Sequence, residues 1–111
     1  MIEVLFYRKE SGALKGFQIS GHAGYGESGN DIVCAAVSAL SENLVNSVEA
    51  FTGDKPESLA VNEEEGFLHF TLSEVSTETE LLLKSFRLGI EIIQKEYPEY
   101  LQIRYVEEST C

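Results

Sequence analysis

Residues 21–38 read GHAGYGESGNDIVCAAVS and join a glycine-rich loop to the start of a predicted helix. His22 follows directly after a predicted strand, and Cys34 falls within the predicted first turn of the helix. Three glycines after His22 permit positive φ angles, so the loop between the two side chains can open and close. This stretch therefore predicts a base and a nucleophile separated by a hinge.

Upstream of this stretch the sequence predicts a β-hairpin. Residues 2–9 place Ile2, Val4 and Phe6 on one face of a strand, and residues 13–20 also alternate between apolar and polar side chains. Residues 10–12 (ESG) have the composition of the turn that joins the two strands. His22 is then expected just past the end of the second strand.

Downstream, helical periodicity begins near Asn30 or Asp31, which are both suitable N-cap residues, and ends near Gly53. Apolar residues at spacings of three and four predict a stripe that faces the core, formed by Val33, Val37, Leu40, Leu44, Val48 and Phe51. Either start leaves Cys34 in the first helical turn, with Ser38 one turn later on the same side.

The second half of the chain predicts strands at residues 57–62 and 67–72, joined by the acidic turn 63–66 (EEEG), which we expect to be solvated. A helix follows from residues 76–80 to Tyr97, and a last strand covers residues 100–106. The order is β-β-α-β-β-α-β. The predicted fold is α/β (α+β), with two helices against one mixed sheet in two layers.

Length and charge narrow the possible functions. A chain of 111 residues suits one domain, residues 1–111, with a single core. Nineteen acidic and eight basic residues give a formal net charge of -11, which disfavours nucleic acid and favours a basic peptide as partner. The sequence shows no apolar run that could span a membrane and no signal-peptide pattern, so we expect a cytoplasmic protein without membrane contact.

The position predicted for Cys34 suits a reactive thiol. Unpaired N–H groups and the positive dipole end at a helix N-terminus stabilise a thiolate, and the same groups could stabilise an oxyanion. His22 could then act as general base and acid. Two other interpretations stay open from the residues alone: Cys34 as a small buried side chain, and His22 as a turn or capping residue.

The polar neighbours of this pair are each open to two interpretations. Asp31 could orient the His22 imidazole or cap the helix, and its charge would oppose ionisation of Cys34. Ser38 could donate a hydrogen bond into a cleft or bond back to the carbonyl four residues earlier. Metal binding by His22, Asp31 and Cys34 is a weaker alternative because the spacing is irregular and a fourth ligand is lacking, so we expect no metal and no cofactor.

The segments GHA at residues 21–23 and DIVCAAVS at residues 31–38 closely resemble the Prp family, the ribosomal-processing cysteine proteases of Firmicutes and their relatives. The resemblance extends over the chain in length and element order. It implies a homodimeric cysteine endopeptidase that removes the N-terminal extension of a large-subunit ribosomal protein during ribosome assembly. The family's substrates resemble a short peptide with paired phenylalanines before the cut and lysines soon after it.

The resemblance also implies a role for each residue of the central stretch. Cys34 would be the nucleophile, His22 the base, and Gly21 the residue that positions the histidine. Asp31 and Ser38 would support the active site. A mobile gate over the substrate is implied for Ala23, Gly24, Tyr25, Gly26, Glu27, Ser28, Gly29 and Asn30.

The residues alone leave a second class of function open. A non-catalytic acidic binding module, or an assembly factor, could hold a basic ribosomal protein through charge complementarity. For the implied homodimer, Leu5 and Tyr7 on the outer face of the sheet are the expected contacts.

Overall fold

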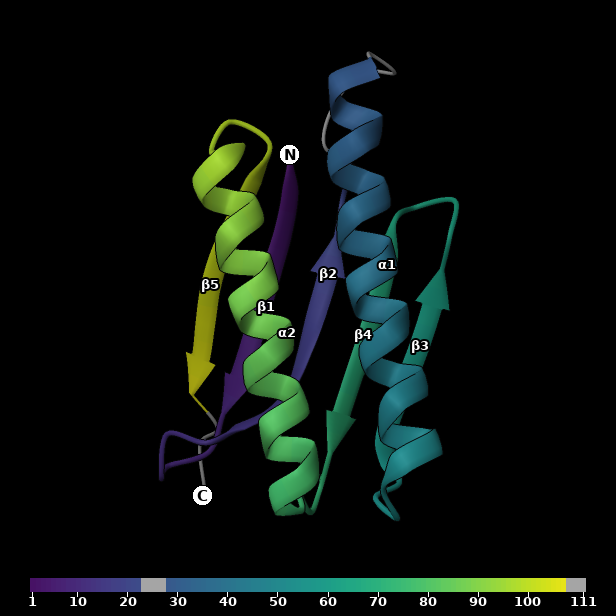
Figure 1. Cartoon of the computed structure of the whole chain (residues 1–111), viewed down its shortest axis with the longest axis vertical. Coiled ribbons are helices and arrows are strands. Elements are labelled where there is room, and N and C mark those ends of the chain that lie inside the picture. The colour runs from purple at the N-terminus through teal and green to yellow at the C-terminus, as the bar shows by residue number, and fades with distance from the viewer. Residues whose placement is uncertain (23–27, 108–111) are drawn as a thin grey trace.

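In the computed structural model, two helices pack side by side on one face of a five-stranded sheet (Figure 1). The structure describes residues 1–22 and 28–107, with the side chains of residues 28–31 left outside the description. The elements in chain order are β1 (Ile2–Arg8), β2 (Leu14–Ser20), α1 (Ser28–Phe51), β3 (Pro56–Asn62), β4 (Phe67–Leu72), α2 (Thr77–Glu96) and β5 (Leu101–Glu107). The predicted element order and α+β fold are confirmed.

The sheet is mixed because β1 pairs with β5 in parallel while all other neighbours are antiparallel. The strand order is β3-β4-β2-β1-β5, so β2 pairs with β4 across a long separation in sequence. The registers place Phe6 opposite Phe17 and Phe17 opposite Phe70. Because side chains alternate between the faces of a strand, these three rings point to the same side, toward the helices.

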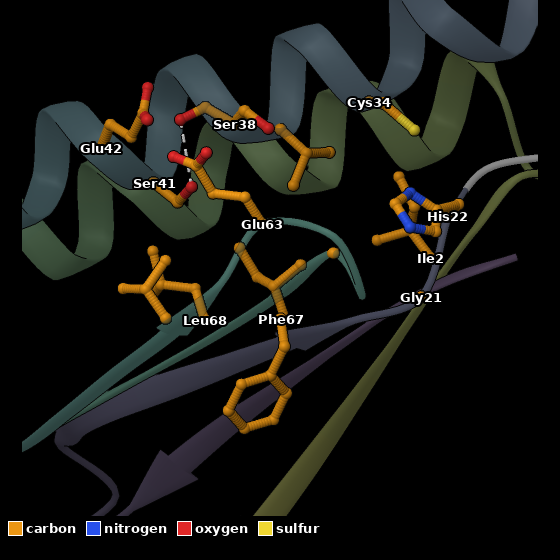
Figure 2. A pocket seen from close by; sticks show the side chains of 14 residues that line it. Ile2, Gly21, His22, Cys34, Ser38, Ser41, Glu42, Glu63, Phe67 and Leu68 are labelled. Carbon is orange, nitrogen blue, oxygen red and sulfur yellow. Dashed lines mark hydrogen bonds between the residues drawn. The ribbon is translucent and has the colours of Figure 1, made fainter.

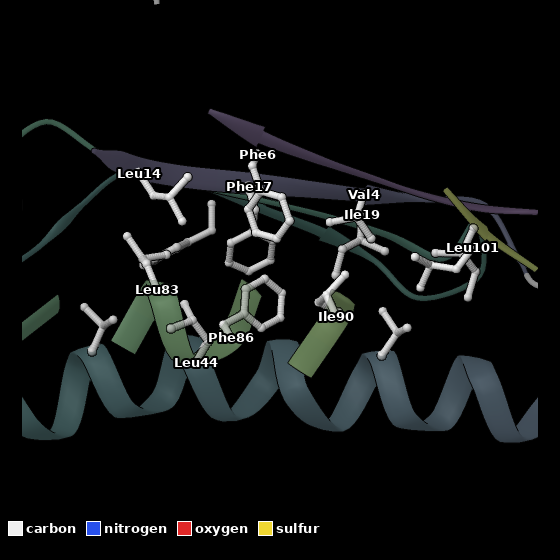
Figure 3. Packing of buried hydrophobic residues seen from close by; sticks show 14 of the residues in the cluster. Val4, Phe6, Leu14, Phe17, Ile19, Leu44, Leu83, Phe86, Ile90 and Leu101 are labelled. Carbon is white, nitrogen blue, oxygen red and sulfur yellow. The ribbon is translucent and has the colours of Figure 1, made fainter. Parts of the chain in front are cut away.

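The core lies between this face of the sheet and the two helices (Figure 3). The Phe86 ring of α2 enters it with centroids 5.8 Å from Phe6 and 4.4 Å from Phe17. The buried apolar residues are Ile2, Val4, Phe6, Leu14, Phe17, Ile19, Val33, Val37, Leu44, Val48, Phe70, Leu72, Leu83, Phe86, Ile90 and Leu101. Burial of this much apolar surface is the main favourable contribution to folding.

Helix α1 differs from its prediction at both ends. It begins at Ser28, earlier than the predicted start at Asn30 or Asp31, so residues 28–30 belong to the helix and not to the loop. Gly29 weakens a helix but does not stop one, which explains why the helix extends through it. At the other end Phe51 is 77% exposed, so the predicted core stripe stops at Val48 because nothing covers the last helical residue.

Hydrogen bonds tie the end of α1 to the start of α2. The Asp54 carboxylate accepts from the Ser76 backbone N–H at 2.9 Å and from the Ser76 hydroxyl at 2.7 Å. Ser76 in turn caps α2 by accepting from the Thr79 backbone N–H at 3.2 Å. Hydrogen bonding from the Thr79 side chain, and then from the Ser76 amide and hydroxyl, lowers the pKa of Asp54. The two helices are thereby joined through polar contacts as well as through the core.

Neither helix, within the parts of the chain that the structure describes, has the length and apolar character needed to cross a membrane.

Candidate active site

A cleft of about 300 Å³ lies between α1 and one end of the sheet (Figure 2). It brings together four residues that the sequence analysis selected: Gly21, His22, Cys34 and Ser38. The rest of the lining consists of Ile2, Ile19, Val37, Ser41, Glu42, Val61, Glu63, Gly66, Phe67 and Leu68. A mostly apolar hollow with a few polar groups is the usual form of a ligand site.

Cys34 reaches the cleft because of how α1 is rotated against the core. Val33 and Val37 are buried, which leaves Cys34 half-buried at the edge of the apolar stripe. Figure 2 shows its sulfur pointing from α1 toward the end of β2, where His22 lies. The thiol and the imidazole therefore face the same cleft, although they come from different elements.

The early start of α1 changes the predicted environment of Cys34. Ser28 is six residues before it, so Cys34 lies in the second turn and not in the first. A backbone N–H at that position belongs to the helical hydrogen-bond ladder, and the influence of the dipole falls off within the first turn. The predicted oxyanion site at the N–H groups around Cys34 is therefore wrong for this conformation. His22 lines the same cleft as Cys34.

Gly21 carries the chain out of β2 and into His22. Its φ angle is +89°, a conformation that side chains disfavour. A Cβ atom at this position would lie 2.6 Å from the Met1 carbonyl oxygen, so glycine alone fits between the end of β2 and the N-terminal strand. The prediction that Gly21 positions the histidine is consistent with this packing.

The turn between β3 and β4 contacts His22, and no local pattern in the sequence predicts this contact. The Nε2 atom of His22 lies 3.1 Å from the Glu64 carbonyl oxygen. The side chains of Glu63, Glu64 and Glu65 are exposed, as expected for a solvated turn, but the main chain of this turn lies against the histidine. The sequence predicts that Gly66 is a turn glycine. It does not predict that Gly66 lies beside His22, because local patterns do not show that β2 pairs with β4.

The other end of the cleft is acidic. Glu42 and Glu63 are exposed and line it together with Ser38, on the side away from His22 (Figure 2). The Ser41 hydroxyl donates a hydrogen bond to the Ser38 carbonyl oxygen at 3.1 Å. Glu42 lies one helical turn beyond Ser38, so the period that placed Ser38 near Cys34 would also have identified it.

Some predicted site residues are outside the description. Residues 23–27 of the predicted gate are not described, and residues 28–30 and Asp31 are placed in α1 by their backbone only. Among the described side chains there is no group of three His, Cys, Asp or Glu that could hold a metal ion. The roles predicted for Asp31 and for the loop therefore stay predictions.

Comparison with known proteins identifies relatives over nearly the whole chain. A family model described as Cysteine protease Prp matches residues 1–102. Ribosomal processing cysteine protease Prp from Staphylococcus aureus is 32% identical over 108 residues, which cover 95% of this chain and 99% of the relative.

Two crystal structures show the same fold. SMU.848 from Streptococcus mutans has 37% sequence identity and a TM-score of 0.86, covering 97% of this chain and 96% of the other. An essential ribosomal processing protease Prp from Staphylococcus aureus, in complex with a covalently linked product peptide, has 29% identity and a TM-score of 0.87. That match covers 96% of this chain and all of the other, at 100%.

These findings, with a thiol and an imidazole in one cleft, define the protein as a cysteine peptidase. More particularly, the chain belongs to the Cysteine protease Prp family of ribosomal processing proteases. The resemblance seen in the sequence is confirmed.

Proposed function

We propose that this protein is an endopeptidase that removes the N-terminal extension of a large-subunit ribosomal protein during ribosome assembly in the cytoplasm. The observation that supports this most directly is the cleft that contains both Cys34 and His22. The Staphylococcus aureus relative, solved with a covalently linked product peptide, is consistent with covalent catalysis in the family.

In the proposed reaction Cys34 and His22 act as a dyad. His22 accepts the thiol proton, and the thiolate attacks the carbonyl carbon of the scissile peptide bond. The tetrahedral intermediate collapses to a thioester as the imidazolium donates its proton to the departing amine. Water, deprotonated by His22, then attacks the thioester, which releases the carboxylate product and regenerates the thiol. The chemistry needs no cofactor.

The lining of the cleft suits the peptide that the family resemblance implies. Apolar side chains such as Val37, Val61 and Leu68 can bind phenylalanine rings, whereas Glu42 and Glu63 can attract lysines. A net charge of -11 also favours a basic ribosomal protein over nucleic acid, so we expect no direct nucleic acid or membrane contact.

The remaining predicted roles extend this proposal. Asp31 and Ser38 would support the dyad, and residues 23–27, the part of the predicted gate that precedes α1, would gate the cleft. For the proposed homodimer, Leu5 and Tyr7 lie half-buried on the sheet face that the helices leave uncovered. The centroids of the Tyr7 and His69 rings lie 5.5 Å apart on this face. Burial raises the pKa of the Tyr7 hydroxyl.

The alternative of a non-catalytic binding module is not supported, because the chain's relatives are named as proteases. The deciding experiment incubates the protein with peptides that carry ribosomal N-terminal extensions and identifies the products by mass spectrometry. Cys34→Ala should fold and bind peptide but leave it uncut, whereas the matched variant Cys111→Ala should cleave normally. Normal cleavage by Cys34→Ala would refute the proposed mechanism.

A further inference from the structure

We propose that the main-chain carbonyl of Glu64 fixes the tautomer of His22 and so makes Nδ1 the catalytic base, with Gly66 holding the carbonyl in place. The inference rests on the catalytic role of His22 proposed above and adds the group that orients it. Glu64 and Gly66 act here as positioning residues, since neither supplies an atom to the reaction.

The chemistry of the contact decides which ring nitrogen carries the proton. A carbonyl oxygen can only accept, so Nε2 at 3.1 Å from it must be the donor. Neutral imidazole has one N–H, which leaves the lone pair on Nδ1. In the imidazolium form both nitrogens are donors, and the same contact persists. The carbonyl therefore orients the ring in both protonation states. In the neutral form it leaves the lone pair on Nδ1, the nitrogen that would exchange a proton with the Cys34 sulfur.

Gly66 allows the turn to approach the histidine this closely. Its φ angle is +64°, and a Cβ atom would lie 2.5 Å from the Gly21 carbonyl oxygen and 2.9 Å from Cε1 of His22. The β2–β4 register explains the meeting, because Ile19 pairs with Leu68 and continued antiparallel pairing sets Gly21 opposite Gly66. Any larger residue at position 66 would have to displace the imidazole or the main chain beside it.

Two further hydrogen bonds stabilise the turn that carries the Glu64 carbonyl. The Gly66 N–H donates to the Glu63 carbonyl oxygen at 3.2 Å, and the Glu65 N–H donates to Asn62 Oδ1 at 3.3 Å. These two hydrogen bonds join residues that precede Glu64 in the chain to residues that follow it. The acceptor is thus preorganised by the hairpin, in a role that a carboxylate or amide side chain fills in other His-dependent sites.

The tautomer can be measured directly by long-range proton–nitrogen NMR of the uniformly ¹⁵N-labelled protein at a pH where the histidines are neutral. We expect His22 to be protonated at Nε2 and unprotonated at Nδ1. His69 is an internal contrast, since its Nδ1 lies 2.9 Å from Gln18 Oε1 and should carry the proton. A His69→Gln variant assigns the two sets of signals. A His22 ring protonated at Nδ1 would overturn the inference.

A second experiment tests Gly66 against a matched glycine. Gly12 also has a positive φ, +91°, but a Cβ there would meet nothing within 4 Å. Gly66→Ala should lower kcat about tenfold or more, change KM less and give a mixture of His22 tautomers. Gly12→Ala introduces the same backbone strain but should preserve both kcat and the His22 tautomer.

The outcomes separate this inference from the proposed function. Wild-type kcat and tautomer in Gly66→Ala would overturn the positioning role. Gly66→Asn, in which the residue tolerates positive φ but keeps the Cβ clash, should behave like Gly66→Ala, and if neither variant folds, the tautomer of the wild-type protein decides. Unimpaired cleavage by His22→Ala would instead refute the dyad, whatever tautomer the ring adopts.

Discussion

Phe86 connects α2 to the sheet, and its replacement by leucine should weaken the core without altering the cleft. The side chain is 4% exposed and forms close ring pairs with Phe6 and Phe17. Each aromatic pair contributes about 0.5–1.5 kcal/mol beyond burial, so losing both lowers the free energy of unfolding by roughly 2 kcal/mol. The smaller side chain also leaves a void, which brings the total to about 2–3 kcal/mol.

This loss translates into a measurable change in the thermal midpoint. An unfolding entropy of about 2 cal/mol/K per residue predicts that Tm falls by roughly 10 °C for a chain of this size. Thermal and urea denaturation followed by circular dichroism measure both quantities. Leu88→Ala is the matched control, because Leu88 lies on the same helix but is 58% exposed, and it should change stability by less than about 0.5 kcal/mol.

Activity provides the second part of the test. Among the described residues that line the cleft, none comes from α2, so Phe86→Leu should keep kcat and KM at temperatures where it is fully folded. A Tm loss of less than about 3 °C would show that the ring contacts contribute little to stability. A large fall in kcat in the folded variant would refute the separation of core and site.

Three further predictions concern other parts of the chain. Gly21→Ala should lower stability by about 1–2 kcal/mol because of its positive φ, and should slow peptide cleavage further by displacing His22; denaturation and kinetics measure the two effects. Asp54→Ala should lower the free energy of unfolding by about 1–2 kcal/mol at pH 7, because the hydrogen bonds to Ser76 are lost. Because folding lowers the pKa of Asp54, the contribution of its carboxylate to stability is complete above the ordinary pKa of 3.8 and disappears as the pH falls through the folded pKa. Urea denaturation should therefore give the same free energy of unfolding for the variant and the wild type in acid. The double variant Glu42→Gln with Glu63→Gln should raise KM for a lysine-containing peptide several-fold at low salt and little at high salt, with kcat unchanged; equal effects at both ionic strengths would exclude a role for their charge.

Local patterns in the sequence determined the element order and the chemical character of the site. Strand alternation in residues 2–9 and helical spacing from Val33 to Val48 depend on neighbours within a few residues, and burial follows both patterns in the structure. The residue types of His22 and Cys34 are likewise a property of the sequence, as is the resemblance to Prp that the family model confirms.

Only the tertiary structure decided how the site is assembled. The pairing of β2 with β4 brings Gly66 and the Glu64 carbonyl to His22, and the position of α1 places Glu42 near Glu63. The start of α1 at Ser28, which moves Cys34 out of the first turn, was also missed. Contacts between residues far apart in the sequence depend on how the whole sheet pairs and packs, and helix ends depend on small differences in free energy between neighbouring starts. Periodicity contains neither kind of information, because it reports only which face of an element is buried.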